Sequence, residues 1–447
     1  MNLKSSPNSL GDLSYRNLLS KAWPIILANA SVPLLGLVDT AILGRYEDAA
    51  QLAALALVVV TFNFLYWGFG FLRMGTTGLI AFAHGKGDSL ESLRIFIRSA
   101  VVALVISFVL ILLSPFAFAA GMAFFSPSEL AFELSGQYFF IRIFSAPASF
   151  LLFSISGVLI GLGASRSLLL MSIFLNTSNV LLDLLFAGFF GLGVEGLAWG
   201  TLVAEYSSVL VGVFLLYRAG LFGELNALAK VIRHVFAWHD MKAFFALNAN
   251  LMVRTLFLLA TFMWFTRAGA ANGELNLAAN HVLLQFVAFC AFFLDGFAHV
   301  LEPLVGRASA NKDKKLFLLA CKRTTILSVI LAAAFAGFIG VFADDMLRLL
   351  LDDGQIVEKA ILHVGQLSLY IVIAVWAFQL DGIYIGLAYG KALRNASILA
   401  AVGFYCIFEY GTKAYANDGL WWAFIAYAAL RSLFLLLYWP SLLKRYF

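Results

Sequence analysis

Two acidic residues stand inside long apolar stretches of the sequence, where water is not available to stabilise an ionised carboxylate. Asp39 lies in the run VPLLGLVDTAILGR, and Asp183 lies in a second apolar run, one helical turn after Asn179. An ionisable group within hydrocarbon costs roughly 2.5 kcal/mol or more, so such groups are usually retained for function. The chemistry open to them is the binding and release of a cation, either H⁺ or Na⁺.

Their spacing along predicted helices places these residues at a similar depth. Asp39 lies five residues, about 8 Å, from the end of its helix. Asp183 and Thr201 each lie eight residues, about 12 Å, from a turn at residues 191–193. The predicted cation-binding residues are Asp39, Asn179, Asp183 and Thr201. Two carboxylates in one pocket would repel each other when both are ionised, and a proton or Na⁺ would relieve that repulsion. In the alternative interpretation, each acid is hydrogen-bonded separately or faces a polar interior.

The helices that hold these residues are predicted to cross a membrane. The chain is 62% hydrophobic and 12% charged, whereas a soluble domain has about 25% charged residues. Charge-free stretches such as residues 99–128, 143–165 and 324–343 are long enough, because about 20 helical residues span the hydrocarbon of a bilayer. We therefore predict an all-α polytopic membrane protein with 12 transmembrane helices. The predicted spans are residues 17–43, 52–83, 95–118, 130–162, 167–188, 195–217, 240–266, 277–305, 317–341, 360–388, 394–412 and 420–442.

A weak internal repeat divides these helices into two halves. The run GVLIGLG at 157–163 is followed 225 residues later by GIYIGLA at 382–388, and GLAWG at 196–200 is followed 223 residues later by GLWWA. Because each half has six helices, both halves enter the membrane in the same direction, as a parallel repeat. The predicted domains are two pseudo-symmetric six-helix lobes, at residues 1–222 and 223–447.

The basic residues predict the orientation of the chain. Of the 30 Lys and Arg, 21 fall on the side of the N-terminus and five on the opposite side. Because basic residues concentrate in cytoplasmic loops, we expect both termini in the cytoplasm of a multi-pass protein of the bacterial inner membrane.

Several motifs resemble those of the multidrug and toxic compound extrusion family, in particular its prokaryotic DinF-like branch. They are the Asp39 segment, AHGKGD at 83–88, GVLIGLGASR at 157–166 and GVEGLAWGT at 193–201. The resemblance implies two six-helix lobes in a V shape, exporting drugs in exchange for H⁺ or Na⁺. It also implies that Asp39, Asn179, Asp183 and Thr201 form the cation site. The proline linked to bending of the first helix corresponds to Pro24, although Pro33 is also present.

The second half departs from one branch of that family, which places acids on the seventh and tenth helices. The predicted seventh helix carries Arg254 and no acid within the membrane, whereas the tenth carries Asp381. Because buried charges are usually paired, we expect Asp381 to neutralise Arg254 or Arg431 within a charge network that includes Asp295. A second relay through Asp295, Glu302, His281 and His299 is the alternative to such a structural network.

Aromatic residues on the predicted second and eighth helices suggest a substrate surface. Flat, amphipathic and often cationic compounds bind aromatic walls by burial and cation–π contact. The predicted cleft residues are Phe64, Trp67, Phe286, Phe289 and Phe293. Packing alone accounts for most of the other aromatic side chains.

The sequence favours a transporter over other classes. It contains no P-loop and no nucleophile motif, so we expect neither an enzyme nor ATP-driven transport. The three scattered cysteines and the dispersed basic residues predict neither a metal site nor nucleic-acid binding, and no cofactor beyond the coupling ion is expected. The leading hypothesis is a monomeric, proton-coupled antiporter of amphipathic small molecules. A flippase of lipid-linked oligosaccharides or lipids, which needs a basic cleft, and an intramembrane enzyme or receptor-like scaffold are the alternatives.

Overall fold

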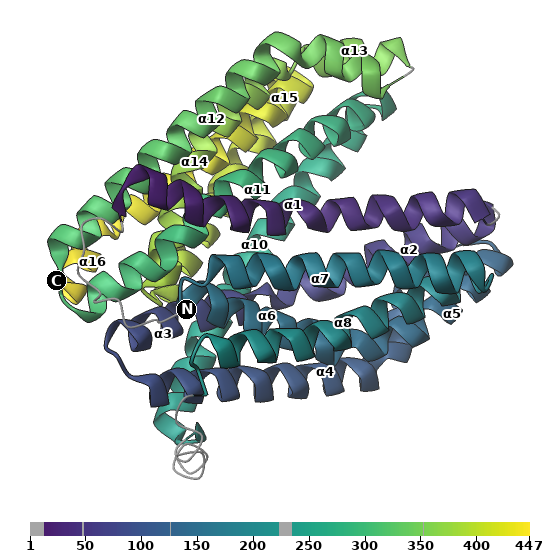
Figure 1. Ribbon diagram of the computed structural model, residues 1–447. Coiled ribbons are helices and arrows are strands. Elements are labelled where there is room, and N and C mark those ends of the chain that lie inside the picture. The colour runs from purple at the N-terminus through teal and green to yellow at the C-terminus, as the bar shows by residue number, and fades with distance from the viewer. Residues whose placement is uncertain (1–12, 47–48, 126, 223–234, 352) are drawn as a thin grey trace. The chain divides into compact units, whose positions relative to one another are not determined.

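A computed structural model describes residues 13–46, 49–125, 127–222, 235–351 and 353–447, and every regular element in those ranges is a helix (Figure 1). The described residues divide into two compact units, which we call unit 1 (from Leu27 to Phe244) and unit 2 (up to Ile26, and from Phe245 to Phe447). The boundary falls inside the first helix, between Ile26 and Leu27, so that this helix contributes to both units.

Two of the predicted spans in unit 1 are interrupted by short turns of 3₁₀ helix. The span predicted at 52–83 has its break at η2, and the span predicted at 130–162 has its break at η3, where Pro147 begins the next helix. The elements are α1 (Tyr15–Tyr46), α2 (Ala49–Trp67), η2 (Gly68–Gly70), α3 (Phe71–Gly85), α4 (Ser89–Phe125), α5 (Glu129–Arg142), η3 (Ile143–Ser145), α6 (Ala146–Gly161), α7 (Ser165–Asp183), the π-helical η4 (Leu184–Phe189) and α8 (Gly193–Arg218).

Unit 2 contains the remaining spans and one reversal within a helical run. Its elements are α10 (Trp238–Ala271, whose residues up to Phe244 belong to unit 1), α11 (Glu274–Ala310), α12 (Lys314–Leu350), α13 (Gly354–Ile361), α14 (Val364–Gly386), α15 (Gly390–Leu437) and α16 (Trp439–Tyr446). Helix α15 folds back on itself at Ala416, which has a φ of 48°. A Cβ built on Gly419 would overlap the carbonyl of Gly411, and one on Gly403 would overlap Leu430, so the two arms of α15 run antiparallel.

The twelve predicted transmembrane helices are confirmed. Ten stretches of the described residues are long and apolar enough to cross a membrane. One of them, Gly390–Tyr446, contains the reversal and supplies two crossings, and α1 supplies the remaining helix. Outward faces carry large exposed apolar side chains, such as Phe108, Leu112 and Phe116 on α4, as contact with lipid requires.

The internal repeat is visible in matched close contacts between helices. In each unit, two glycines one turn apart let their helix approach the backbone of a neighbouring helix, where a Cβ would overlap backbone atoms. The pairs are Gly157 with Arg73, Gly161 with Thr77, Gly382 with Ala298, and Gly386 with Glu302. Each residue of the last two pairs lies 225 positions after its counterpart in the first two. The GVLIGLG and GIYIGLA runs therefore occupy equivalent places in the two units.

Two arginines, also 225 positions apart, make matching contacts. In unit 1, Arg98 Nε donates to the carbonyl of Val235 at 2.7 Å, and its guanidinium pairs with Asp240 at 2.8 Å. In unit 2, Arg323 Nη1 donates to the carbonyl of Leu13 at 2.8 Å. Leu13 and Val235, which are 222 positions apart, each precede the first helix of one repeat. An arginine of each repeat thus donates a hydrogen bond to the backbone just before the first helix of the other repeat.

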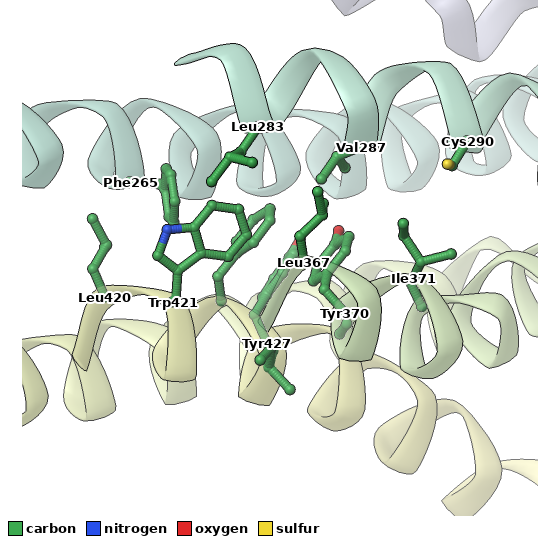
Figure 2. Packing of buried hydrophobic residues seen from close by; sticks show 14 of the residues in the cluster. Phe265, Leu283, Val287, Cys290, Leu367, Tyr370, Ile371, Leu420, Trp421 and Tyr427 are labelled. Atoms are coloured by element: carbon green, nitrogen blue, oxygen red, sulfur yellow. The ribbon is translucent and has the colours of Figure 1, made fainter. Parts of the chain in front are cut away.

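The core of unit 2 is built from aromatic and aliphatic side chains. Figure 2 shows Phe265, Trp421 and Tyr427 packed with aliphatic residues such as Leu283. The rings of Tyr370 and Phe424 stack with centroids 4.4 Å apart. Because lipid tails are as apolar as these side chains, the core of a membrane-spanning unit is stabilised by close van der Waals packing between its helices.

Candidate functional site

The carboxyl groups of Asp39 and Asp183 meet inside unit 1. Asp183 is the last residue of α7, is fully buried, and is followed directly by the π-helical η4, a kind of distortion that is frequent at functional sites. Asp39 lies on α1 and is half-buried, and its carboxyl group lies close enough to that of Asp183 for each to act electrostatically on the other. Both carboxyl oxygens of Asp183 and Oδ1 of Asp39 are buried and have no hydrogen-bond partner among the described residues. The predicted meeting of these acids is therefore present in the structure.

Asn179 and Thr201 extend the same site. Asn179 lies one turn before Asp183, and its Nδ2 donates to Thr201 Oγ1 at 3.1 Å. The Thr201 hydroxyl in turn donates to the carbonyl of Leu197 at 2.9 Å. Within the described part of the chain, no protein donor reaches the buried Oδ1 of Asn179 or either carboxyl oxygen of Asp183. Buried acceptors that lack donors are costly, and a proton or a hard cation would satisfy them.

Glycines on α8 allow this close packing. A Cβ on Gly200 would lie 2.1 Å from Asp183 Oδ1, so the absence of a side chain there makes room for the carboxylate. Gly196, one turn earlier, lies against the backbone of Ala187 in η4. We had not predicted a role for either glycine, although both lie in the GVEGLAWGT motif.

A charged layer lies one helical turn away, and sequence reasoning gave its members no role. Arg142 follows Tyr138 by one turn of α5, and Glu205 follows Thr201 by one turn of α8. Arg142 Nη2 pairs with Glu205 Oε1 at 2.7 Å. Ser149 Oγ donates to Glu205 Oε2, and Arg142 donates to the hydroxyl of Ser145. The i, i+4 spacing of polar residues on α5 and α8 is the sequence feature that could have indicated these residues.

The equivalent positions of unit 2 hold aromatic side chains instead. An offset of 225 takes Asp39 to Trp264, Asn179 to Phe404 and Asp183 to Phe408, and the GLAWG offset of 223 takes Thr201 to Phe424. Phe404 and Phe424 are fully buried, and the rings of Phe404 and Phe408 stack at 5.9 Å. The two units thus share a backbone arrangement, but the polar side chains of the pocket occur in unit 1 and aromatic ones replace them in unit 2.

The predicted charge network of the second half is present in part. Asp381 on α14 pairs with both Arg254 on α10 and Arg431 on α15, and all three side chains are buried. Asp295 lies half-buried on α11. On the same helix, His299 Nε2 lies 3.9 Å from Glu302 Oε1, and His281 is exposed. The double pairing leaves Asp381 fully neutralised, which argues against cation binding there.

The predicted aromatic cleft residues are only partly described. The side chains of Phe64 and Trp67 lie outside the described residues. In unit 2, Phe286 packs against the core, while the rings of Phe289 and Phe293 contact each other and a third ring on α12. Phe289 is 51% exposed, so this face of α11 remains accessible.

The predicted hinge prolines both lie within α1. The helix continues through Pro24 and Pro33. Pro24 is buried and lies two residues before the boundary between the units, whereas the side chain of Pro33 lies outside the described residues. A proline within a helix removes a backbone hydrogen bond and so weakens the helix at that point.

Comparison with known proteins identifies the family. The MatE family model matches the chain twice, at residues 24–185 and 249–410, which repeats the offset of 225. The chain is 30% identical over 427 residues to DNA damage-inducible protein F of Escherichia coli K12, covering 94% of this chain and 90% of the relative. It is 22% identical to the probable multidrug resistance protein NorM of Thermotoga maritima, covering 79% of this chain and 76% of the relative.

Solved structures share the fold. The Vibrio cholerae MATE transporter VcmN in its bent form has a TM-score of 0.83 at 18% identity, with 97% of this chain and 98% of that chain covered. A transporter of the MOP superfamily from Pyrococcus furiosus has a TM-score of 0.84 at 16% identity, with coverage of 98% and 99%. The chain is a multi-pass membrane transporter and not an enzyme. It belongs to the MatE family.

Proposed function

We propose that this protein is a secondary active antiporter that exports amphipathic, often cationic small molecules in exchange for H⁺, with Na⁺ as the less favoured coupling ion. The observation that carries the proposal is the pair of neighbouring carboxyl groups of Asp39 and Asp183, of which Asp183 is fully buried and has no hydrogen-bond donor among the described residues. In the membrane interior, a site that bears acceptors and one unsatisfied negative charge binds a cation strongly. The similarity to the probable multidrug resistance protein NorM of Thermotoga maritima supports the substrate class.

Coupling follows from the position of Asp39 on a helix shared by both units. Residues up to Ile26 of α1 belong to unit 2, and residues from Leu27 belong to unit 1. When a proton leaves the pair, the two carboxylates repel each other, and the resulting force acts on α1. Bending near Pro24 or Pro33 would then change how α1 joins the two units, and this change would alternate access to the substrate.

The cellular arrangement that fits this function is a monomer in the bacterial inner membrane, with both termini in the cytoplasm. The excess of basic residues on the side of the termini supports this orientation. Substrate released to the outside would then move against the entering proton.

The flippase alternative finds less support in the charges. A flippase would bind phosphate headgroups through free basic side chains, but three of the four arginines within the spans are paired with acids. These arginines are Arg142, Arg254 and Arg431.

Transport in proteoliposomes tests the proposal. The wild type should move a fluorescent cationic dye when a pH gradient is imposed, and Asp39→Asn should abolish that movement while the purified protein keeps its thermal stability. A Na⁺ gradient applied without a pH gradient distinguishes the two ions. Undiminished transport by Asp39→Asn would refute the assignment of the site.

A further inference from the structure

The Arg142–Glu205 ion pair lies next to the carboxyl pair, one helical turn away on two helices. Tyr138 and Arg142 share a face of α5, and Thr201 and Glu205 share a face of α8. The charge of Arg142 acts on both Asp39 and Asp183. The titratable and charged groups around the carboxyl pair are Tyr138 and Arg142 from α5, Tyr66 from α2 and Glu205 from α8.

The charges in this region are unequal in number. Asp39, Asp183 and Glu205 supply three carboxyl groups, against the single guanidinium of Arg142. A guanidinium in reach of several carboxylates would neutralise whichever it approaches most closely. Here it bonds to Glu205 and to the Ser145 hydroxyl, and Glu205 is fixed in turn by Ser149. Among the described residues, the aspartates are therefore left without a permanent counter-charge.

Unit 2 has no ion pair at the equivalent positions among its described residues. The offsets of the repeat take Arg142 to Leu367 and Glu205 to Ala428, which are fully buried in the apolar core of unit 2. A buried ion pair is often no more stabilising than apolar residues that fill the same space. The retention of both charges in unit 1 calls for an explanation other than packing.

We propose that Glu205 is a positioning residue that holds Arg142 away from Asp39 and Asp183, so that the aspartates are neutralised by the exchanged cation and not by the protein. This inference rests on the proposed cation coupling and adds to it the group that keeps the site vacant for the ion. Without the Glu205 charge, the guanidinium favours the ionised aspartates, and a proton then binds less tightly.

The test measures the protonation of carboxyl groups directly, by infrared difference spectroscopy of the purified protein over a pH series. The carbonyl band of a protonated carboxyl group, assigned to the site by its loss in Asp39→Asn, gives a pH midpoint. Glu205→Gln should lower that midpoint by about one pH unit or more, which is a tenfold weaker binding of the proton. Glu205→Asp should restore most of the wild-type midpoint. Glu195→Gln, which removes a carboxylate elsewhere on α8, should leave the midpoint unchanged.

A double variant separates positioning from mere structural support. Arg142→Leu with Glu205→Ala copies the residues of unit 2 and removes both charges, so its midpoint should return to within about half a unit of the wild type. The inference is overturned if Glu205→Gln titrates like the wild type, or if the double variant is shifted as far as the single one. The spectra do not depend on transport. If the pH midpoints shift as expected but the protein moves no dye, the result would count against the antiport proposal and not against the role of Glu205.

Discussion

Adding a single methyl group at Gly200 should disable the cation site while sparing the fold. The new Cβ would lie 2.1 Å from Asp183 Oδ1, whereas ordinary contacts begin at 3.4 Å, so the carboxylate must withdraw by about 1.3 Å. The Cβ would also lie 3.1 Å from the Asp183 amide nitrogen, which limits relief by a shift of the whole helix. Such a displacement exceeds the roughly 0.5 Å within which a binding site must hold its groups, so the Asp183 carboxyl group would no longer be placed to share a cation with Asp39.

The cost to stability should be small. Overpacking typically costs about 1–3 kcal/mol, and replacing a helical glycine by alanine returns about 1 kcal/mol. We expect Gly200→Ala to lose about 0–2 kcal/mol of stability and most of its cation-driven transport. Thermal denaturation in detergent and dye transport in proteoliposomes measure the two quantities.

A matched control lies three turns along the same helix. A Cβ on Gly212 would meet only the ends of flexible side chains, Ile155 at 3.0 Å and Met171 Sδ at 3.1 Å, which can move aside. Gly212→Ala should therefore keep both stability and transport. Wild-type coupled transport by Gly200→Ala would refute the close packing of Asp183 against α8 as a requirement of the site.

Three further predictions concern unit 2. Asp381→Asn removes the carboxylate that pairs with the buried guanidinium groups of Arg254 and Arg431, and should cost about 3–5 kcal/mol, seen as a lower melting temperature; an unchanged melting temperature would contradict the pairing. Arg323→Ala removes the hydrogen bond to the carbonyl of Leu13 and should speed amide hydrogen exchange in the first turns of α1 but not in α7. Equal changes in exchange rate in both helices would argue against a stabilising role for this hydrogen bond. Burial lowers the pKa of His363 from 6.5, so the unfolded chain binds more protons, and stability should be full above pH 6.5 and fall below it. His363→Gln should flatten that dependence, and an equally steep loss in the variant would exclude His363 as its source.

Much of the fold was predictable from the sequence, because apolar length and charge boundaries mark each crossing. The interruptions within spans were not, since they depend on local backbone geometry. Three short elements fall inside or between predicted spans. They are the two 3₁₀ turns Gly68–Gly70 and Ile143–Ser145 and the short helix Gly354–Ile361. The reversal at Ala416 was expected as a loop but is a sharp turn, stabilised where Asn417 Nδ2 donates to His363 Nε2 at 2.7 Å and to Asn280 Oδ1 at 3.1 Å.

The four polar residues of the pocket were predictable because each is conspicuous in an apolar helix. Their neighbours were not, because the partner of a buried charge is set by tertiary packing. Arg142 could have faced either the aspartates or Glu205, and only coordinates show that it pairs with Glu205. The role of Gly200 is likewise invisible in sequence, since it depends on which atom lies opposite.

The most direct test of the account is the movement of protons caused by substrate. Proteoliposomes that contain a pH-sensitive dye report proton flux when substrate is added without any imposed gradient. We predict that transport by the wild type drives protons in the opposite direction, and that Asp39→Asn and Asp183→Asn each abolish this flux. Substrate movement without any counterflow of H⁺ or Na⁺, or proton flux that survives in both variants, would contradict the account.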